Sequence, residues 1–173
     1  MNDSIGKLFV IVLGAFLMVF FPLIQMLENQ EDISRMFVQT EAGRFVDSVR
    51  NTGYITPRMY QDFLTALASS GMLFEIELEH LHRKYDPVYV DPLESNSFTG
   101  EVKVNYNAFY TEDILMELTE EAAKERYVLS KGDYFTVNIS NREKTLATKT
   151  KELFLGSDFP VETIIVRYGG MVH

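Results

Sequence analysis

The sequence predicts an α+β fold, in which a long N-terminal helix is followed by a small mixed domain of helices and an antiparallel sheet. Two observations predict it: an uncharged apolar run of about twenty residues near the N-terminus, and beyond it a succession of segments with helical or strand-like periodicity. About 145 residues follow the run, which is enough for one compact domain. Hydrophobic residues make up 46% of the chain and can fill its core.

The first element is the apolar run at residues 8–27. Residues 8–24 are all apolar, Gly or Pro, and no charged residue occurs between Lys7 and Glu28. A helix of this length spans about 30 Å, the thickness of a bilayer core, and a helix buried in a soluble protein is rarely apolar on every side. A cleaved signal peptide is the alternative, but the run is longer than a usual signal core and no A-x-A-like site follows it. We therefore expect a transmembrane helix.

The flanks of this run predict its orientation. Lys7 and the α-amino group precede it, whereas three acidic residues follow it before the next base, Arg35. By the positive-inside rule, residues 1–7 form a cytoplasmic leader and the domain lies outside the cell membrane. The sequence thus predicts a single-pass membrane protein with the lipid bilayer as its first partner.

Residues 28–51 are predicted to continue the span as an amphipathic helix. Apolar residues recur there at steps of three and four, with charged residues between them: Ile33, Met36, Phe37, Phe45, Val46 and Val49. Only polar residues separate this segment from the span. One long helix is therefore expected from about residue 4 to residue 51, with a kink at Pro22 and a turn at Gly53 to end it.

Residues 52–173 are predicted to form the soluble domain. Its first helix, residues 57–70, begins with the N-cap Thr56 and a first-turn proline. Strand-like alternation is regular at residues 74–79 and falters at His80. The remaining predicted elements are a long exposed loop around residues 87–97, a strand at 101–106, a helix at 112–126 capped by Thr111, a strand at 134–139, a helix at 143–154, and a strand at 162–168 that ends at Gly169 and Gly170.

Composition narrows the range of functions. The net charge is -9, and phosphate binding needs clustered Lys and Arg, so no nucleic-acid partner is expected. The chain has no Cys, which excludes disulfides, thiolate metal sites and Cys nucleophiles. The acid pairs Asp113 with Glu117 and Glu120 with Glu121 are typical of a solvated helix face rather than of acid-base catalysis.

His80 and His82 are candidates for a metal site. Their side chains share a face if they lie in a strand, and two imidazoles on one face can bind zinc. No third ligand of the right type stands at a fixed spacing, so the solvent face of a strand near its end is the favoured interpretation. No nucleotide-binding, hydrolase or metalloprotease motif occurs. The sequence therefore predicts no catalytic residue, no cofactor and no bound metal.

An apolar N-terminal helix that continues into an amphipathic one and then into a small sheet domain is the architecture of pilins and pseudopilins. More specifically, the stretches GRFVDSVRNTGYITPRMYQDFLTAL, FEIELEHLHRKYDP and IIVRYGG resemble pilin-like proteins related to the Tad-type (TadE-like) pseudopilins of Gram-positive bacteria. The resemblance covers most of the chain. It implies a role without catalysis in a pilus or secretion apparatus, with the N-terminal helix contacting other subunits or copies of itself.

The chain departs from typical type IV pilins at its N-terminus. Those proteins have a processing glycine followed by an apolar run with Glu at its fifth position. Here Gly6 is followed by Lys7, and no acid occurs in residues 8–27. The resemblance therefore implies neither processing at Gly6 nor helix registration by that Glu, and a permanently anchored relative that never enters a filament remains open.

Three hypotheses follow for the function. The first is a structural or assembly component of a pilus-like or secretion apparatus. The alternative is a membrane-anchored extracytoplasmic binding or adaptor domain, in which the amphipathic helix only supports the fold. An anchored enzyme is the third, because a site assembled from distant residues leaves no spacing signature.

Overall fold

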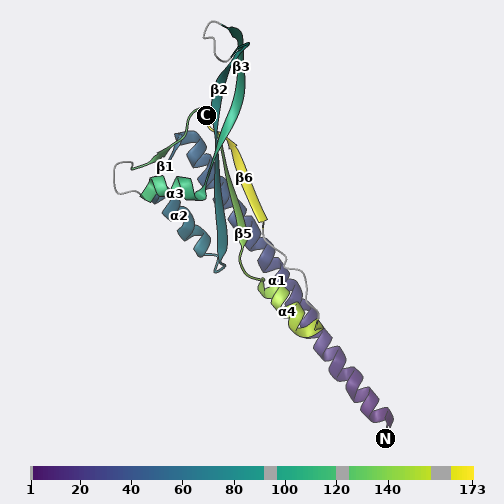
Figure 1. The fold of residues 1–173 in the computed structure, drawn as a ribbon. Coiled ribbons are helices and arrows are strands. Elements are labelled where there is room, and N and C mark those ends of the chain that lie inside the picture. Colours follow the sequence, from purple (N-terminus) through teal and green to yellow (C-terminus); the bar gives the residue numbers. More distant parts are fainter. Residues whose placement is uncertain (1, 92–96, 120–124, 157–164) are drawn as a thin grey trace.

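The computed structural model describes residues 2–91, 97–119, 125–156 and 165–173. The fold is α+β, as predicted (Figure 1). In chain order the elements are α1 (Asn2–Thr52), β1 (Tyr54–Ile55), α2 (Pro57–Ala68), β2 (Phe74–Tyr89), β3 (Phe98–Tyr110), α3 (Thr111–Thr119), β4 (Tyr127–Val128), β5 (Tyr134–Asn141), α4 (Leu146–Leu155) and β6 (Ile165–Met171). The start of α1 extends from one end of the molecule and the hairpin of β2 and β3 from the other.

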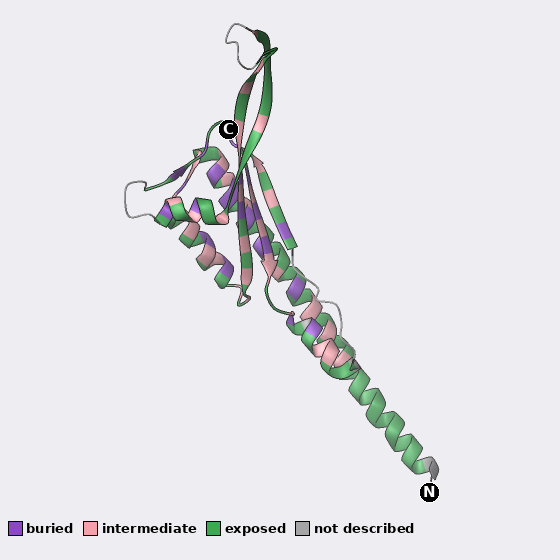
Figure 2. Cartoon of the chain, viewed as in Figure 1, coloured by how far each residue is buried: buried purple, intermediate pink, exposed green. Residues whose placement is uncertain are grey.

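Helix α1 is 51 residues long and joins the segments 8–27 and 28–51 into one helix, as predicted. It continues through Pro22, which removes only one backbone hydrogen bond. Among the described residues α1 is the one helix long and apolar enough to cross a membrane, and no residue of its apolar window is buried in the domain. Figure 2 shows the helix changing from exposed at its start to partly buried where it meets the domain.

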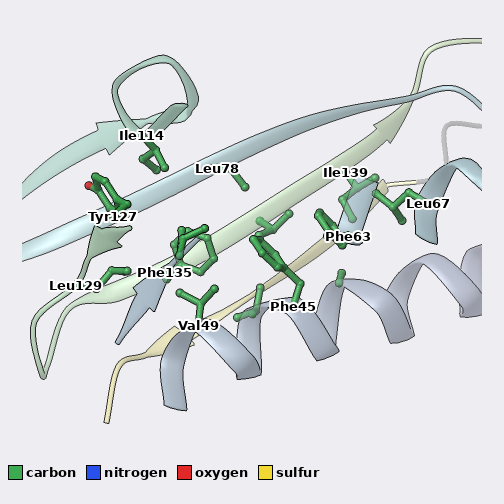
Figure 3. Close-up of a cluster of buried hydrophobic side chains, with 14 of the residues drawn as sticks. Phe45, Val49, Phe63, Leu67, Leu78, Ile114, Tyr127, Leu129, Phe135 and Ile139 are labelled. Atoms are coloured by element: carbon green, nitrogen blue, oxygen red, sulfur yellow. The ribbon is translucent and has the colours of Figure 1, made fainter. Parts of the chain in front are cut away.

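The second half of α1 packs on a four-stranded antiparallel sheet with strand order β3-β2-β5-β6. Val38, Ala42, Val46 and Val49 of α1 are completely buried at helical spacing. The strands face them with alternate residues, because successive side chains of a strand point to opposite faces. The buried apolar residues of these strands are Leu78 of β2, Phe135, Val137 and Ile139 of β5, and Val166 of β6. Figure 3 labels Leu78, Phe135 and Ile139 among them.

Helix α2 closes one side of this core. It begins as predicted, because Thr56 Oγ1 accepts a hydrogen bond from the N–H of Met59 at 3.1 Å and Pro57 occupies the first turn. Phe63 of α2 stacks on Phe45 of α1 with ring centroids 4.5 Å apart (Figure 3). Strands β1 and β4 form a separate two-stranded sheet, which is too short to leave a periodic pattern in the sequence.

The predicted ends of β2 and β3 were wrong. Strand β2 continues past His80 to Tyr89, and β3 covers Phe98–Tyr110 rather than residues 101–106, because the two strands pair from Glu79↔Tyr110 out to Tyr89↔Phe98. Residues 87–89 of the predicted loop therefore belong to β2. Pro87 is tolerated because β2 is paired on only one side at this point. Residues 92–96 of the predicted loop lie outside the described residues.

The prediction that the last strand ends at Gly169 and Gly170 was also wrong. Strand β6 continues through both glycines to Met171, because Gly169 and Gly170 pair with Thr136 and Phe135 of β5. Close packing explains why both positions are glycine. A Cβ on Gly169 would lie 2.9 Å from the carbonyl oxygen of Phe135, and one on Gly170 would lie 2.7 Å from the Arg50 guanidinium. The glycines are therefore packing residues within the strand.

Two further helices differ from the prediction only at their ends. Helix α3 ends at Thr119, where helix was predicted to residue 126; residues 120–124 lie outside the described residues. Thr111 is the first residue of α3 rather than its cap, and its Oγ1 accepts a hydrogen bond from the N–H of Leu78 at 2.8 Å. Helix α4 begins at Leu146 because the side chain of Thr145 caps it by accepting from Thr148 N–H.

Two Gly→Ala substitutions test this packing in opposite directions. Gly43→Ala in α1 places its Cβ at an ordinary 3.6 Å from the Tyr168 ring, so the gain in helix propensity should raise the free energy of unfolding by about 0.5–1 kcal/mol. Gly169→Ala should lower it by about 1–3 kcal/mol through overpacking. Urea unfolding of the full chain in detergent measures both. Equal effects of the two substitutions would contradict the described packing of β6.

Candidate functional site

The histidine pair lies on one face of β2, as expected for residues two apart in a strand. Their ring centroids are 6.0 Å apart. The interpretation of this segment as a solvent face was wrong for His80, which is only 3% exposed. His80 follows Leu78 on the face of β2 that is turned to the core, so its imidazole occupies a core position. The side chain of His82, at 41% exposed, reaches solvent.

Asp133, in the turn before β5, is the third member of this site and is 1% exposed. Its Oδ2 lies 2.9 Å from His80 Nε2 and 3.0 Å from His82 Nδ1, and it also accepts from the N–H of Ser130 at 2.8 Å. Its Oδ1 accepts from the N–H of Arg83 at 2.9 Å. One carboxylate thus receives four hydrogen bonds and joins β2 to the turn before β5.

Tyr127 of β4 extends the cluster on the far side of His80, with its hydroxyl 2.6 Å from His80 Nδ1. An ionised carboxylate can only accept, so His80 Nε2–H and His82 Nδ1–H both donate to Asp133. A neutral His80 then has an unprotonated Nδ1, which accepts from the Tyr127 hydroxyl. We call Tyr127, His80, Asp133 and His82 the histidine–aspartate network.

Burial and hydrogen bonding set the charges in this network. Burial lowers the pKa of His80 below its usual value, against the opposing effect of Asp133, and so favours the neutral imidazole. Burial alone would raise the pKa of Asp133, but the hydrogen bonds from Arg83, both histidines and Ser130 outweigh it and lower the pKa to about 2. Burial also raises the pKa of Tyr127, so its hydroxyl stays protonated and able to donate.

The same atoms form a possible metal-ligand set. One ligand atom each from His80, His82 and Asp133 lies within 4.8 Å of the others, and two imidazoles with a carboxylate suit zinc. A metal would have to replace the protons that both rings donate to Asp133. The hydrogen bonds already satisfy the network, and no buried side-chain N or O among the described residues lacks a partner. The geometry therefore favours a structural network at the end of the core.

Of the acid pairs considered from the sequence, the structure describes only Asp113 and Glu117. Asp113 lies in the first turn of α3, where its Oδ2 accepts from the N–H of Tyr110 at 3.0 Å. This is the stabilising position for a carboxylate at a helix N-terminus. Glu120 and Glu121 lie outside the described residues.

A second candidate site is the ribbon formed by the outer parts of β2 and β3. Strand β5 pairs with β2 only as far as Leu81, so beyond that residue the hairpin projects from the sheet (Figure 1). Directly opposed residues of antiparallel strands share a face. One face of the ribbon carries apolar and aromatic residues from both strands, and we call it the apolar ribbon face: Tyr85, Pro87, Val102, Val104 and Tyr106.

The apolar ribbon face is open to solvent. The exposed fraction is 55% for Tyr85 and 51% for Val102, and the Tyr89–Phe98 ring pair, with centroids 5.8 Å apart, extends the surface toward the ribbon's end. The opposite face carries polar groups, among them Asp86, which accepts from the side-chain amide of Asn105 at 2.6 Å. Strand β3 is also an edge of the sheet, and exposed edges of this kind are templates for further pairing. The ribbon is therefore a candidate protein-interaction surface.

No protein-family model, curated protein or solved structure matches this chain.

Asp133→Asn tests the structural role of the network. The amide N–H of the new side chain would face groups that now donate hydrogen bonds to the carboxylate. The free energy of unfolding should therefore fall by about 2–4 kcal/mol. Chemical unfolding of the full chain in detergent measures the loss. The control is Asp62→Asn, at a side chain that is 75% exposed, where a change within about 0.5 kcal/mol is expected. An equally small effect at Asp133 would contradict the role assigned to it.

Acidification should destabilise the fold in two windows. His80 has a lower pKa folded than unfolded, so the unfolded state binds more protons and stability falls as the pH drops below 6.5, the ordinary histidine value. The pKa of Asp133 is also lower in the folded state, so its contribution to stability is lost as the pH falls from 3.8, the ordinary aspartate value, through about 2. Melting temperature against pH measures both.

His80→Gln removes the imidazole that titrates in the upper window, so the melting temperature of this variant should depend less on pH near neutrality. A wild-type melting temperature that rises, instead of falling, as the pH is lowered from about 7.5 to about 5.5 would contradict the expected effect of His80.

Proposed function

We propose that this chain is a single-pass membrane protein that serves as a non-catalytic structural or assembly component of a pilus-like or secretion apparatus. The observation that carries the proposal is the continuity of α1. One helix supplies an exposed apolar segment at residues 8–27 and completely buried core residues at Val38, Ala42, Val46 and Val49.

The exposed half of α1 needs a cover. Thirteen large apolar side chains between residues 8 and 27 are 41–80% exposed. Removing them from water would contribute a free energy on the order of 20 kcal/mol, since full burial of one such side chain contributes about 1.5–3 kcal/mol. That exceeds the net stability of an ordinary domain, about 5–15 kcal/mol. A lipid bilayer supplies such a cover for a segment of this length.

The flanking charges support an orientation with the N-terminus in the cytoplasm and the domain outside. In that orientation α1 links the bilayer to the domain without a hinge. Apolar helices of this kind can lie in the bilayer as monomers and bundle against one another in an assembly. The resemblance of the chain to Tad-type pseudopilins supports the same use of the helix.

A membrane-anchored extracytoplasmic binding or adaptor domain is the second candidate, and the apolar ribbon face favours it. This face lies at the end of the molecule remote from the start of α1 (Figure 1). A partner protein could bind there while α1 serves only as an anchor.

Photo-crosslinking in the native membrane tests the first proposal. A photoreactive residue replaces Met18, which is 80% exposed in the apolar half of α1, or Tyr85 on the ribbon. Adducts from position 18 to another copy or to an apparatus subunit are expected, because that half of α1 is the assembly element. Recovery of monomer alone from position 18 would overturn the proposal.

Exchange of residues 8–24 for an unrelated apolar segment of equal length separates the two candidates. The first candidate requires the native helix surface, so capture of apparatus subunits should be lost from both crosslinking positions. Capture that persists from position 85 after the exchange would instead favour the adaptor.

A further inference from the structure

Helix α4 lies against the apolar half of α1, although it belongs to the domain by its place in the chain (Figure 1). The ring of Phe154 meets the ring of Phe20 edge-on with centroids 4.6 Å apart, and it lies 6.0 Å from the ring of Phe16. Both partners fall within residues 8–27. The end of α4 therefore packs on the segment that is proposed to cross the bilayer.

An ion pair joins α4 to α1 just beyond the apolar run. Lys151 Nζ lies 2.7 Å from Glu28 Oε1, and Glu28 is the first charged residue after the apolar run. Phe20 precedes Glu28 by eight residues and Phe16 by twelve, which places them about 12 Å and 18 Å further along the helix axis at about 1.5 Å per residue. Half of a hydrocarbon core is about 15 Å thick. Phe154 is thus at a depth that lipid occupies once Glu28 stands at the surface.

The residues of α4 are distributed as this position requires. Its charged side chains are ion-paired: Lys149 with Glu143, Lys144 with Glu152, and Lys151 with Glu28. The last turn brings Leu153 and Phe154, with Leu153 79% exposed. Leu153 is exposed, and the ring of Phe154 beside it contacts α1. Apolar side chains at the tip of a helix are suited to acyl chains and poorly suited to water.

We propose that the C-terminal turn of α4, Leu153 and Phe154, inserts into the outer leaflet of the bilayer beside α1. The inference rests on the proposed anchoring by residues 8–27. It gives the domain a second membrane contact, which fixes how the domain stands on the bilayer. It also covers α1 at Phe16 and Phe20, so other subunits must approach α1 from its remaining sides.

The absence of cysteine from the chain makes single-cysteine probes specific. Leu153→Cys probes the tip of α4, Met18→Cys probes the span, and Met116→Cys, at a 59% exposed position of α3, is the aqueous control. Each full-length variant is labelled with the fluorophore NBD and reconstituted into phosphatidylcholine–phosphatidylglycerol vesicles, with or without nitroxide-labelled lipid. The substituted positions are exposed, so the fold should be retained.

The proposal expects the nitroxide lipid to quench the probe at position 153 as it quenches the one at 18, with no quenching at 116. Quenching at 18 but not at 153 would overturn the insertion of α4 and leave the anchor standing. Absence of quenching at both positions would overturn the anchor as well. A probe at 153 that is blue-shifted but unquenched, and more so at high protein density, would show that a second copy covers the tip, which also overturns insertion into lipid.

Discussion

The packing of the second half of α1 against the sheet is the contact on which the rest of the structure depends. Val38, Ala42, Val46 and Val49 are completely buried, and they recur at the spacing that keeps one side of the helix on β5 and β6. No break separates these residues from the apolar first half of α1. The core of the domain therefore fixes the direction of the apolar segment, because both belong to one continuous helix.

The same core explains the change in pattern at His80. Up to Leu78 the apolar residues of β2 face α1, whereas from Leu81 onward they lie on the opposite face and continue into Tyr85 and Tyr89. The switch occurs where the strand leaves the region covered by α1 and becomes half of the projecting ribbon. His80 stands at the transition, and its buried ring is matched by Asp133 and Tyr127 because a buried polar group needs hydrogen-bond partners.

Whether a feature could be predicted from the sequence depends on how far apart in the chain its interacting residues are. Helices α1 and α2 depend on local spacing and caps such as Thr56, and both were predicted nearly to their ends. The length of β2 depends on pairing with residues up to Tyr110, which no local pattern contains. The histidine–aspartate network could not be predicted for the same reason, since Tyr127 and Asp133 are 47 and 53 residues from His80. A turn at Asp133 beside a strand was the only local signal.

Charge distinguishes the ribbon from the body of the domain. Of the total net charge of -9, the ribbon sequence from Arg83 to Tyr106 contributes three bases and four acids, or -1. A second acidic protein would be repelled by the body of the domain but little by the ribbon, because like charges oppose association mainly at close range in physiological salt. The apolar ribbon face thus combines weak repulsion with exposed aromatic area, whereas the apolar half of α1 is suited to lipid or to other apolar helices. The two ends therefore offer different surfaces, an aromatic ribbon with an edge strand at one and an apolar helix at the other.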